Sequence, residues 1–151
     1  MGELTEDLGF LLARVSGEVV RATNAALAGE GLRVRQYSVL LLACDSAGGI
    51  SQRAMARILG LDPSQVVALV DELAQARLVE RQPDPADRRA KLVIATAAGR
   101  RVRGQATARA EAAVRGALRP LADDEQAALR AFLSRVAPAP HPAPAQARTT
   151  A

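Results

Sequence analysis

The sequence ISQRAMARILGLDPSQVVALVDELAQA, residues 50–76, divides into two short helices around a single glycine. Ser51 is a favoured N-cap residue, and it predicts a first helix over residues 52–59. Gly60 lets the chain turn sharply after that helix, because glycine accepts a left-handed backbone conformation without steric cost. The side chains expected to face the core are Met55, Ile58 and Leu59.

The second helix has the clearest start signal in the chain. Asp62 is a capping residue, Pro63 suits the first helical position, and Gln65 is placed to complete a capping box. We therefore expect a helix from Pro63 to about residue 76. Its buried stripe is Val66, Leu69, Val70 and Leu73, and its exposed face is Ser64, Gln65, Val67, Ala68, Asp71 and Glu72. Two short helices joined by a tight glycine turn are typical of a helix-turn-helix.

The residues that follow predict a hairpin and two further helices. Strands are expected at 78–82 and 91–95, around a loop whose prolines and aspartates suit a turn. Thr96 can cap a helix over residues 97–118, and three acidic residues from Asp123 suit the positive end of a last helix. That helix is expected to bury Leu129, Phe132, Leu133 and Val136. Residues 137–151 alternate proline with alanine, which predicts a disordered tail.

Before the central stretch, two more helices are expected. Apolar residues recur every three or four positions over 5–28, and a nearly all-apolar run after Arg35 predicts a buried helix. The fold class is therefore mainly α with a small β-hairpin wing. One domain over residues 1–136 would hold a winged helix-turn-helix (33–95) and N- and C-terminal dimerisation helices (5–28 and 97–136). The first apolar stripe is too long for one small core, so a second copy of the chain should cover it.

The composition of the 151 residues excludes several classes of protein. One cysteine, Cys44, and one histidine, His141, argue against a disulfide framework and a metal centre. No cofactor is expected. No run approaches the roughly 18 apolar residues of a membrane span, and the acidic N-terminus is unlike a secretory signal. We expect a cytoplasmic protein without a membrane partner. An enzyme is not expected, because no acid, base and nucleophile converge in the pattern.

Charge is distributed unevenly along the chain. Residues 77–103 carry eight basic side chains against three acidic ones, whereas residues 1–31 carry five acidic against two basic. A local basic surplus suits contact with phosphates, because each neutralised phosphate releases counterions. The alternative is a solvated surface in an arginine-rich protein, since 19 of the 20 basic residues are arginine.

The order of these elements resembles the MarR family over residues 5–136. The residues that carry the resemblance are Ile50-Ser51-Gln52-Arg53, then Asp84-Pro-Ala-Asp87-Arg88-Arg89 in the hairpin loop, and Ala95-Thr96-Ala97-Ala98-Gly99-Arg100 after it. The resemblance implies a transcription regulator, a repressor in our interpretation, that binds a pseudo-palindromic site on double-stranded DNA as a homodimer. The alternative is a winged-helix protein-interaction module that does not bind DNA.

The expected DNA contacts come from both helices and the wing. The residues are Ser51, Gln52, Arg53, Ser64, Gln65, Val67, Ala68, Asp87, Arg88 and Arg89. The resemblance implies that Arg89 enters the minor groove, oriented by Asp87, while Arg88 contacts phosphate. The chain departs from many relatives at Val67-Ala68, where they carry Thr-Arg. Val67 could instead contact a thymine methyl group.

The resemblance also implies control by a small phenolic or anionic lipophilic ligand. Tyr37, Arg14 and Arg21 could line its cleft. We favour the structural alternative, in which Tyr37 lies at the core edge and Arg14, Glu18 and Arg21 form a charge ladder on one helix. Redox sensing through Cys44 is a further alternative. It is disfavoured, because Cys44 lies in an apolar helix beside Asp45, which should raise the pKa of the thiol.

Overall fold

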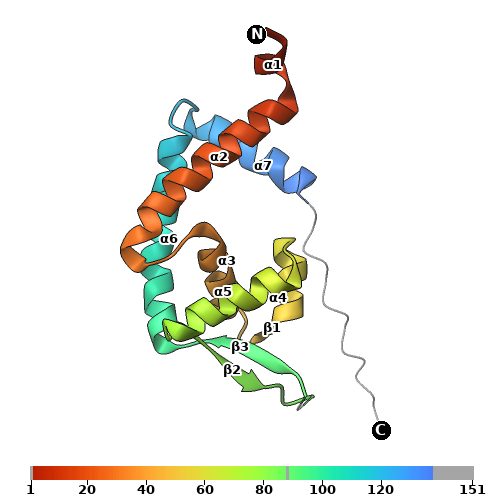
Figure 1. Cartoon of the computed structure of the whole chain (residues 1–151). Helices are drawn as coiled ribbons and strands as arrows, with labels where there is room; N and C mark the ends of the chain where they lie inside the picture. The colour runs from red at the N-terminus through yellow and green to blue at the C-terminus, as the bar shows by residue number, and fades with distance from the viewer. Residues whose placement is uncertain (1, 88, 138–151) are drawn as a thin grey trace.

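The computed structural model describes residues 2–87 and 89–137 (Figure 1). Its helices are α1 (Gly2–Glu6), α2 (Leu8–Leu27), the 3-10 helix η1 (Ala28–Glu30), α3 (Val34–Asp45), α4 (Gln52–Leu59), α5 (Pro63–Gln75), α6 (Ala97–Ala117) and α7 (Asp123–Val136). Its strands are β1 (Ile50–Ser51), β2 (Val79–Pro83) and β3 (Lys91–Ala95). Residues 138–151 of the expected tail and Arg88 lie outside the described residues. No described helix is long and apolar enough to cross a membrane.

The three strands form one antiparallel sheet in the order β1-β3-β2. β2 and β3 make the predicted hairpin, with Val79 opposite Ala95 and Pro83 opposite Lys91. β1 was not expected, because a two-residue strand shows no alternation that the sequence could display. Ile50 of β1 lies opposite Val93, so the strand anchors the start of α4 to the hairpin.

The core surrounds α3, which contributes Val39, Leu40 and Ala43 with no exposed surface. α4 and α5 pack against it as a helix-turn-helix, and Gly60 adopts the expected left-handed conformation between them. The largest fully buried side chains are Leu27, Leu40, Met55, Leu73, Val39, Val66, Val70 and Val93. Ile58 was expected in the core but is 37% exposed, because α4 is short and only one side of it contacts α3 and α5.

Two long helices, α2 and α6, lie side by side and connect this lobe to the far end of the molecule (Figure 1). α6 is rich in alanine, and its Ala106 and Ala110 are buried. Glu30 of η1, whose side chain is 6% exposed, forms an ion pair with Nε of Arg109 of α6 at 3.1 Å. This ion pair joins the end of α2 to the middle of α6.

The expected helix over residues 5–28 is interrupted at Asp7. The Asp7 carboxylate accepts a hydrogen bond from the backbone N–H of Phe10 at 2.7 Å and so caps α2 separately from α1. The apolar stripe of α2 is exposed over its first half, at Leu8, Leu11, Leu12 and Val15. We expected from the sequence an apolar stripe too long for one chain to cover. The exposed first half of α2 fits that expectation.

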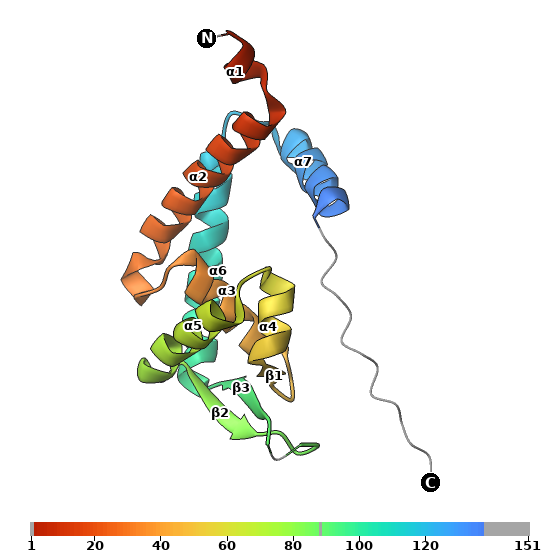
Figure 2. The same ribbon diagram turned by 45° about the vertical axis from the view of Figure 1, so that its right-hand side comes forward.

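The expectation that α7 buries its apolar face is wrong for the single chain. Phe132, Leu133 and Val136 are 60%, 47% and 82% exposed. Figure 2 shows the reason, since α7 diverges from the helix-turn-helix lobe and from α2. Of the four expected residues only Leu129 is half-buried, and it lines a cavity between α6 and α7. The face therefore has no covering element among the described residues of its own chain.

Candidate nucleic-acid interface

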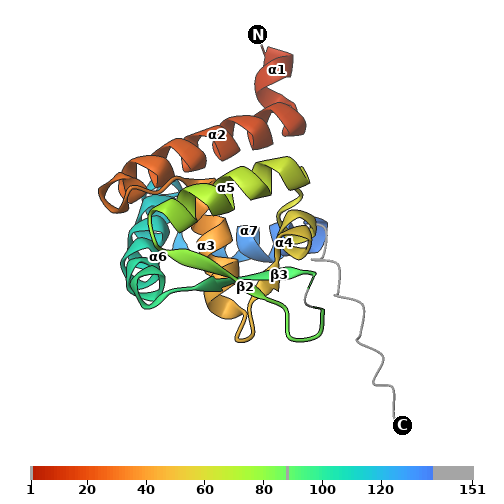
Figure 3. The ribbon, with the colours of Figure 1, turned by 60° about the horizontal axis from the view of Figure 1, so that its bottom comes forward.

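The helix-turn-helix and the hairpin lie at one end of the molecule, with α5 beside the wing (Figure 3). α5 begins at the predicted position because Asp62 caps it. One carboxylate oxygen of Asp62 accepts hydrogen bonds from the Ser64 backbone N–H at 2.8 Å and from its hydroxyl at 2.5 Å. Both bonds favour the charged carboxylate and lower the pKa of Asp62, the hydroxyl bond more than the backbone bond.

The exposed face of α5 is small and has few charges. Ser64, Gln65, Val67 and Ala68 are all exposed, and Val67 shows 40% of its surface. Capping occupies part of this polar chemistry, because Ser64 donates to Asp62 and the Gln65 side-chain oxygen accepts from the Asp62 N–H at 3.4 Å. The Ser64 oxygen and the Gln65 amide nitrogen remain suited to a nucleic acid.

The start of α4 gives its three expected contacts different roles. Ser51 accepts the Ala54 N–H at 3.2 Å, so its hydroxyl oxygen caps the helix. The Gln52 side-chain oxygen accepts a hydrogen bond from Nε of Arg81 at 3.0 Å. Arg53 is exposed. Arg53 is therefore the one member of this set whose side chain suits direct electrostatic contact with phosphate.

Aspartate turns shape the wing loop between β2 and β3. Asp84 accepts the Ala86 N–H at 2.8 Å, and its own N–H donates to the Ala90 carbonyl at 3.0 Å. Asp87 accepts the backbone N–H of Arg89 at 2.9 Å. In this structure Asp87 therefore holds the backbone of Arg89, and Arg89 is exposed.

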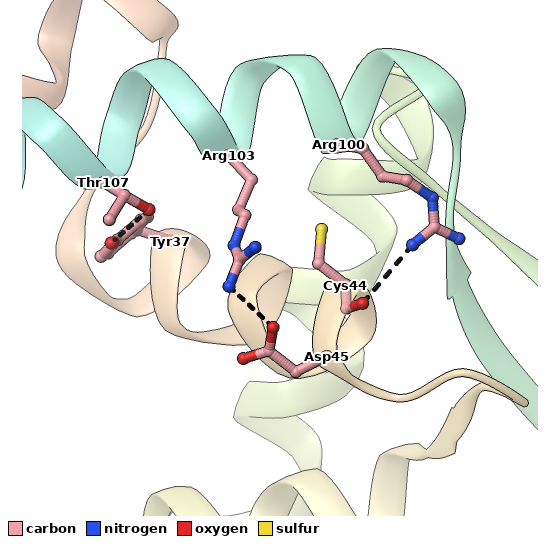
Figure 4. A network of polar contacts seen from close by, with 6 residues as sticks. All are labelled: Tyr37, Cys44, Asp45, Arg100, Arg103 and Thr107. Carbon is pink, nitrogen blue, oxygen red and sulfur yellow. Dashed lines mark hydrogen bonds and ion pairs between the residues drawn. The ribbon is translucent and has the colours of Figure 1, made fainter.

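The three expected ligand residues are not brought together. Arg14 lies over the Phe10 ring, 5.8 Å from its centroid, and Arg21 pairs with Glu18 on the same helix. The Tyr37 hydroxyl donates to the Thr107 hydroxyl at 3.1 Å and joins α3 to α6 (Figure 4). Tyr37 also lines a cavity of about 810 Å³ between α6 and α7.

A different cavity, of about 660 Å³, lies between α2, α3 and α5. Val20 and Leu69 give it apolar walls, and its polar lining includes Asn24, Arg33, Arg35 and Gln36. Gln36 donates to Glu72 of α5 at 2.5 Å, so a hydrogen bond in the cavity wall joins α3 to α5. None of these residues was predicted from the sequence as part of a site. Their one sequence signal is the pair of arginines that flank the start of the core helix.

Cys44 is half-buried on α3, facing two arginines of α6 (Figure 4). Burial raises the pKa of the Cys44 thiol, and Asp45 adds to the rise, while Arg103 and Arg100 oppose it. Arg103 is paired with Asp45 at 2.7 Å, and Arg100 donates to the Cys44 carbonyl at 3.4 Å. The direction agrees with the expectation, although burial rather than Asp45 is the largest cause. A raised pKa leaves little reactive thiolate at neutral pH.

Over the part of the chain that the structure describes, no group of three His, Cys, Asp or Glu side chains is arranged to hold a metal ion. The arrangement instead offers hydrogen-bond donors, exposed arginines and a small apolar patch on α5. These groups can bind phosphates and base edges.

Comparisons with known proteins show which family the chain resembles. A sequence model of the MarR family matches residues 30–90. A MarR-family transcriptional regulator from Rhodococcus sp. RHA1 is 49% identical, with a TM-score of 0.80 over 88% of this chain and 95% of its own. A search of curated proteins found no match.

Two further solved structures carry ligands. CouR from Rhodococcus jostii RHA1, bound to p-coumaroyl-CoA, is 48% identical, with a TM-score of 0.80 over 93% of this chain and 96% of its own. A transcriptional repressor CouR bound to a 23-mer DNA duplex is 33% identical, with a TM-score of 0.83 over 91% of this chain and 96% of its own. With its winged helix-turn-helix between long terminal helices, this chain belongs to the MarR family of transcriptional regulators.

Proposed function

We propose that the protein is a repressor that binds a pseudo-palindromic operator as a homodimer, with residues 1–136 acting as one MarR-like domain. The observation that carries the proposal is the juxtaposition of the exposed α5 face with the wing at one end of the molecule (Figure 3). The 13 residues of α5 span roughly 20 Å, a length that fits the major groove. It is supported by the 33% identical repressor, which was solved with a DNA duplex.

Each part of the interface has a distinct role in this proposal. Ser64, Gln65 and Val67 of α5 contact base edges. Val67 is apolar and cannot form a hydrogen bond, so it contacts a thymine methyl group. Arg53 contacts phosphate, and Arg89 enters the minor groove. The chain acts by binding rather than by catalysis, in the cytoplasm where its DNA lies.

The test measures binding of the purified protein to DNA upstream of its own gene. Fluorescence anisotropy reports the binding across a salt series. Wild type is compared with Arg89→Ala and with Arg119→Ala. Arg119 is also exposed but follows the opposite end of α6 from the wing, so it controls for the loss of one positive charge. We expect salt-sensitive binding that is tighter than on random DNA, weakened by Arg89→Ala and unchanged by Arg119→Ala.

Two results would contradict the proposal. Equal salt-sensitive binding to upstream and random DNA would leave a non-specific basic surface. An absence of binding at low salt would favour the protein-interaction alternative, in which neutralising Arg89 has no effect on the partner.

We further propose that a ligand with an anionic part and an apolar part binds in the cavity between α2, α3 and α5. Its binding releases the protein from DNA. Arg33 and Arg35 supply positive charge to that cavity, and Val20 and Leu69 supply apolar contact. The 48% identical CouR, which was solved with p-coumaroyl-CoA, supports this class of ligand. Titrating p-coumaroyl-CoA, coenzyme A and p-coumarate separately into the protein–DNA complex identifies which part is needed. A DNA complex stable to all three would exclude this ligand.

A further inference from the structure

Arg81 of β2 joins three separate parts of the helix-turn-helix lobe through one guanidinium group. Its Nε donates to the side-chain oxygen of Gln52, the first residue of α4, at 3.0 Å. Its Nη2 forms an ion pair with Asp71 of α5 at 2.5 Å. The side chain is 26% exposed, so most of it lies within the lobe. Arg81 therefore bridges the wing, α4 and α5.

We propose that Arg81 is a positioning residue for operator recognition, which holds α5 at a fixed angle to the wing. The proposal rests on the DNA-binding function proposed above. Base-edge contacts from a recognition helix need its side chains held within about half an ångström of their partners. A guanidinium has donors in a rigid planar fork, so bonds to two helices at once restrict both. Arg81 restricts α4 and α5 relative to the strand that carries the wing.

The polarity of the bond to Gln52 adds a second consequence. Arg81 can only donate hydrogen bonds. The Gln52 amide must therefore point its oxygen, and not its nitrogen, toward Arg81. Both hydrogens of the amide nitrogen are then left to donate elsewhere. A phosphate only accepts hydrogen bonds, so the orientation fixed by Arg81 is the one in which Gln52 can bind the DNA backbone.

Arg81 differs in this respect from the exposed arginines of the lobe. Arg53 and Arg89 are exposed and suit direct phosphate or groove contact. Two nitrogen atoms of Arg81 donate to the neighbouring side chains of Gln52 and Asp71, and the Asp71 carboxylate offsets the charge of Arg81. Its removal should therefore disturb the selection of sequence more than the general attraction to DNA.

The experiment compares wild type, Arg81→Gln, Asp71→Asn and the double variant on the operator and on a random duplex of equal length, across a salt series. We expect each single variant to lower the ratio of operator affinity to random affinity about tenfold, the loss of roughly one well-placed base contact. In the double variant, which removes one charge of each sign, random binding and the slope of affinity against salt stay at the wild-type values. The double variant loses no more than Arg81→Gln alone, because the two substitutions break one ion pair.

Thermal unfolding of each variant sets a temperature at which all are folded, so a loss of stability does not register as a loss of selectivity. Asp71→Asn preserves shape and keeps the test valid if Arg81→Gln fails to fold. Unchanged selectivity in the variants would overturn the proposal. An equal loss on both duplexes with the salt slope reduced by about one would overturn it too, and make Arg81 a phosphate contact. A wild-type protein without operator preference would refute the proposed function, and this proposal with it.

Discussion

At the scale of single residues, Gly99 is the position where the fold tolerates least change among the described glycines. A Cβ atom placed there would lie 2.0 Å from the carbonyl oxygen of Leu78 and 3.2 Å from Cδ1 of Leu40. The first turn of α6 therefore lies directly against the backbone that leads into β2. A carbonyl oxygen in the chain cannot rotate away as a flexible side chain would.

Gly99→Ala should therefore destabilise the protein by about 1–3 kcal/mol through overpacking, despite the better helix propensity of alanine. Gly104 is the matched control, because it lies in the same helix with open space around its Cβ position. Gly104→Ala should stabilise the protein by up to about 1 kcal/mol. Urea unfolding followed by circular dichroism measures both. Equal stabilisation by the two substitutions would show that α6 does not approach Leu78 as closely as described.

At the scale of an element, α5 depends on the side chain that begins it. Ser64 donates two hydrogen bonds to the Asp62 carboxylate and lowers its pKa from the ordinary value of 3.8. A group whose pKa is lowered by folding contributes stability above its unfolded pKa. The contribution is lost as the pH falls through the folded value. The recognition helix should therefore fray in acid before the core does.

Asp62→Asn tests this dependence, because asparagine also caps helices but does not titrate in this range. We expect wild type to be the more stable protein at neutral pH, since the carboxylate also interacts with the positive end of α5. The difference in unfolding free energy should shrink as the pH falls below about 4. Urea midpoints measured at several pH values report it. A difference that stayed constant down to pH 2 would assign the capping energy to groups other than this carboxylate.

At the scale of the whole molecule, we expect a second copy of the chain to cover the apolar faces at the end opposite the wing. α2 exposes Leu8, Leu11, Leu12 and Val15, and α7 exposes Phe132, Leu133 and Val136. Faces of this kind are covered in a stable protein, and a second copy offers the same faces in a two-fold arrangement. Such a dimer would present two recognition helices to one duplex.

Leu12→Asp should weaken dimerisation roughly a hundredfold, because the charge is buried in both copies of a symmetric interface. Operator binding should fall with it, since a monomer engages only half of the site. Ile58→Asp is the control, because Ile58 is a 37% exposed apolar residue on α4, away from these faces. Sedimentation velocity across a concentration series measures the change. A dimer unaffected by Leu12→Asp would place the interface elsewhere on the molecule.

Most of the elements, and the starts of α4, α5 and α6, could be predicted from the sequence alone. Ser51, Asp62 and Thr96 were expected to cap α4, α5 and α6, and all three side chains accept the expected N-terminal hydrogen bonds. Gly60 forms the expected turn, and the α5 stripe is buried as predicted apart from the half-buried Leu69. These features depend on residues within about four positions of one another, so the local order of side chains is enough to specify them.

Only the tertiary structure decided which faces meet. Arg81 contacts Gln52 and Asp71, which lie 29 and 10 positions away, and Tyr37 meets Thr107 across 70 positions. The cavity between α2, α3 and α5 and the open face of α7 likewise depend on how the helices are arranged. Periodicity tells which side of a helix is apolar but not what will cover it. What covers it is decided by the packing of distant segments, and on α2 and α7 we expect a second copy of the chain to supply that cover.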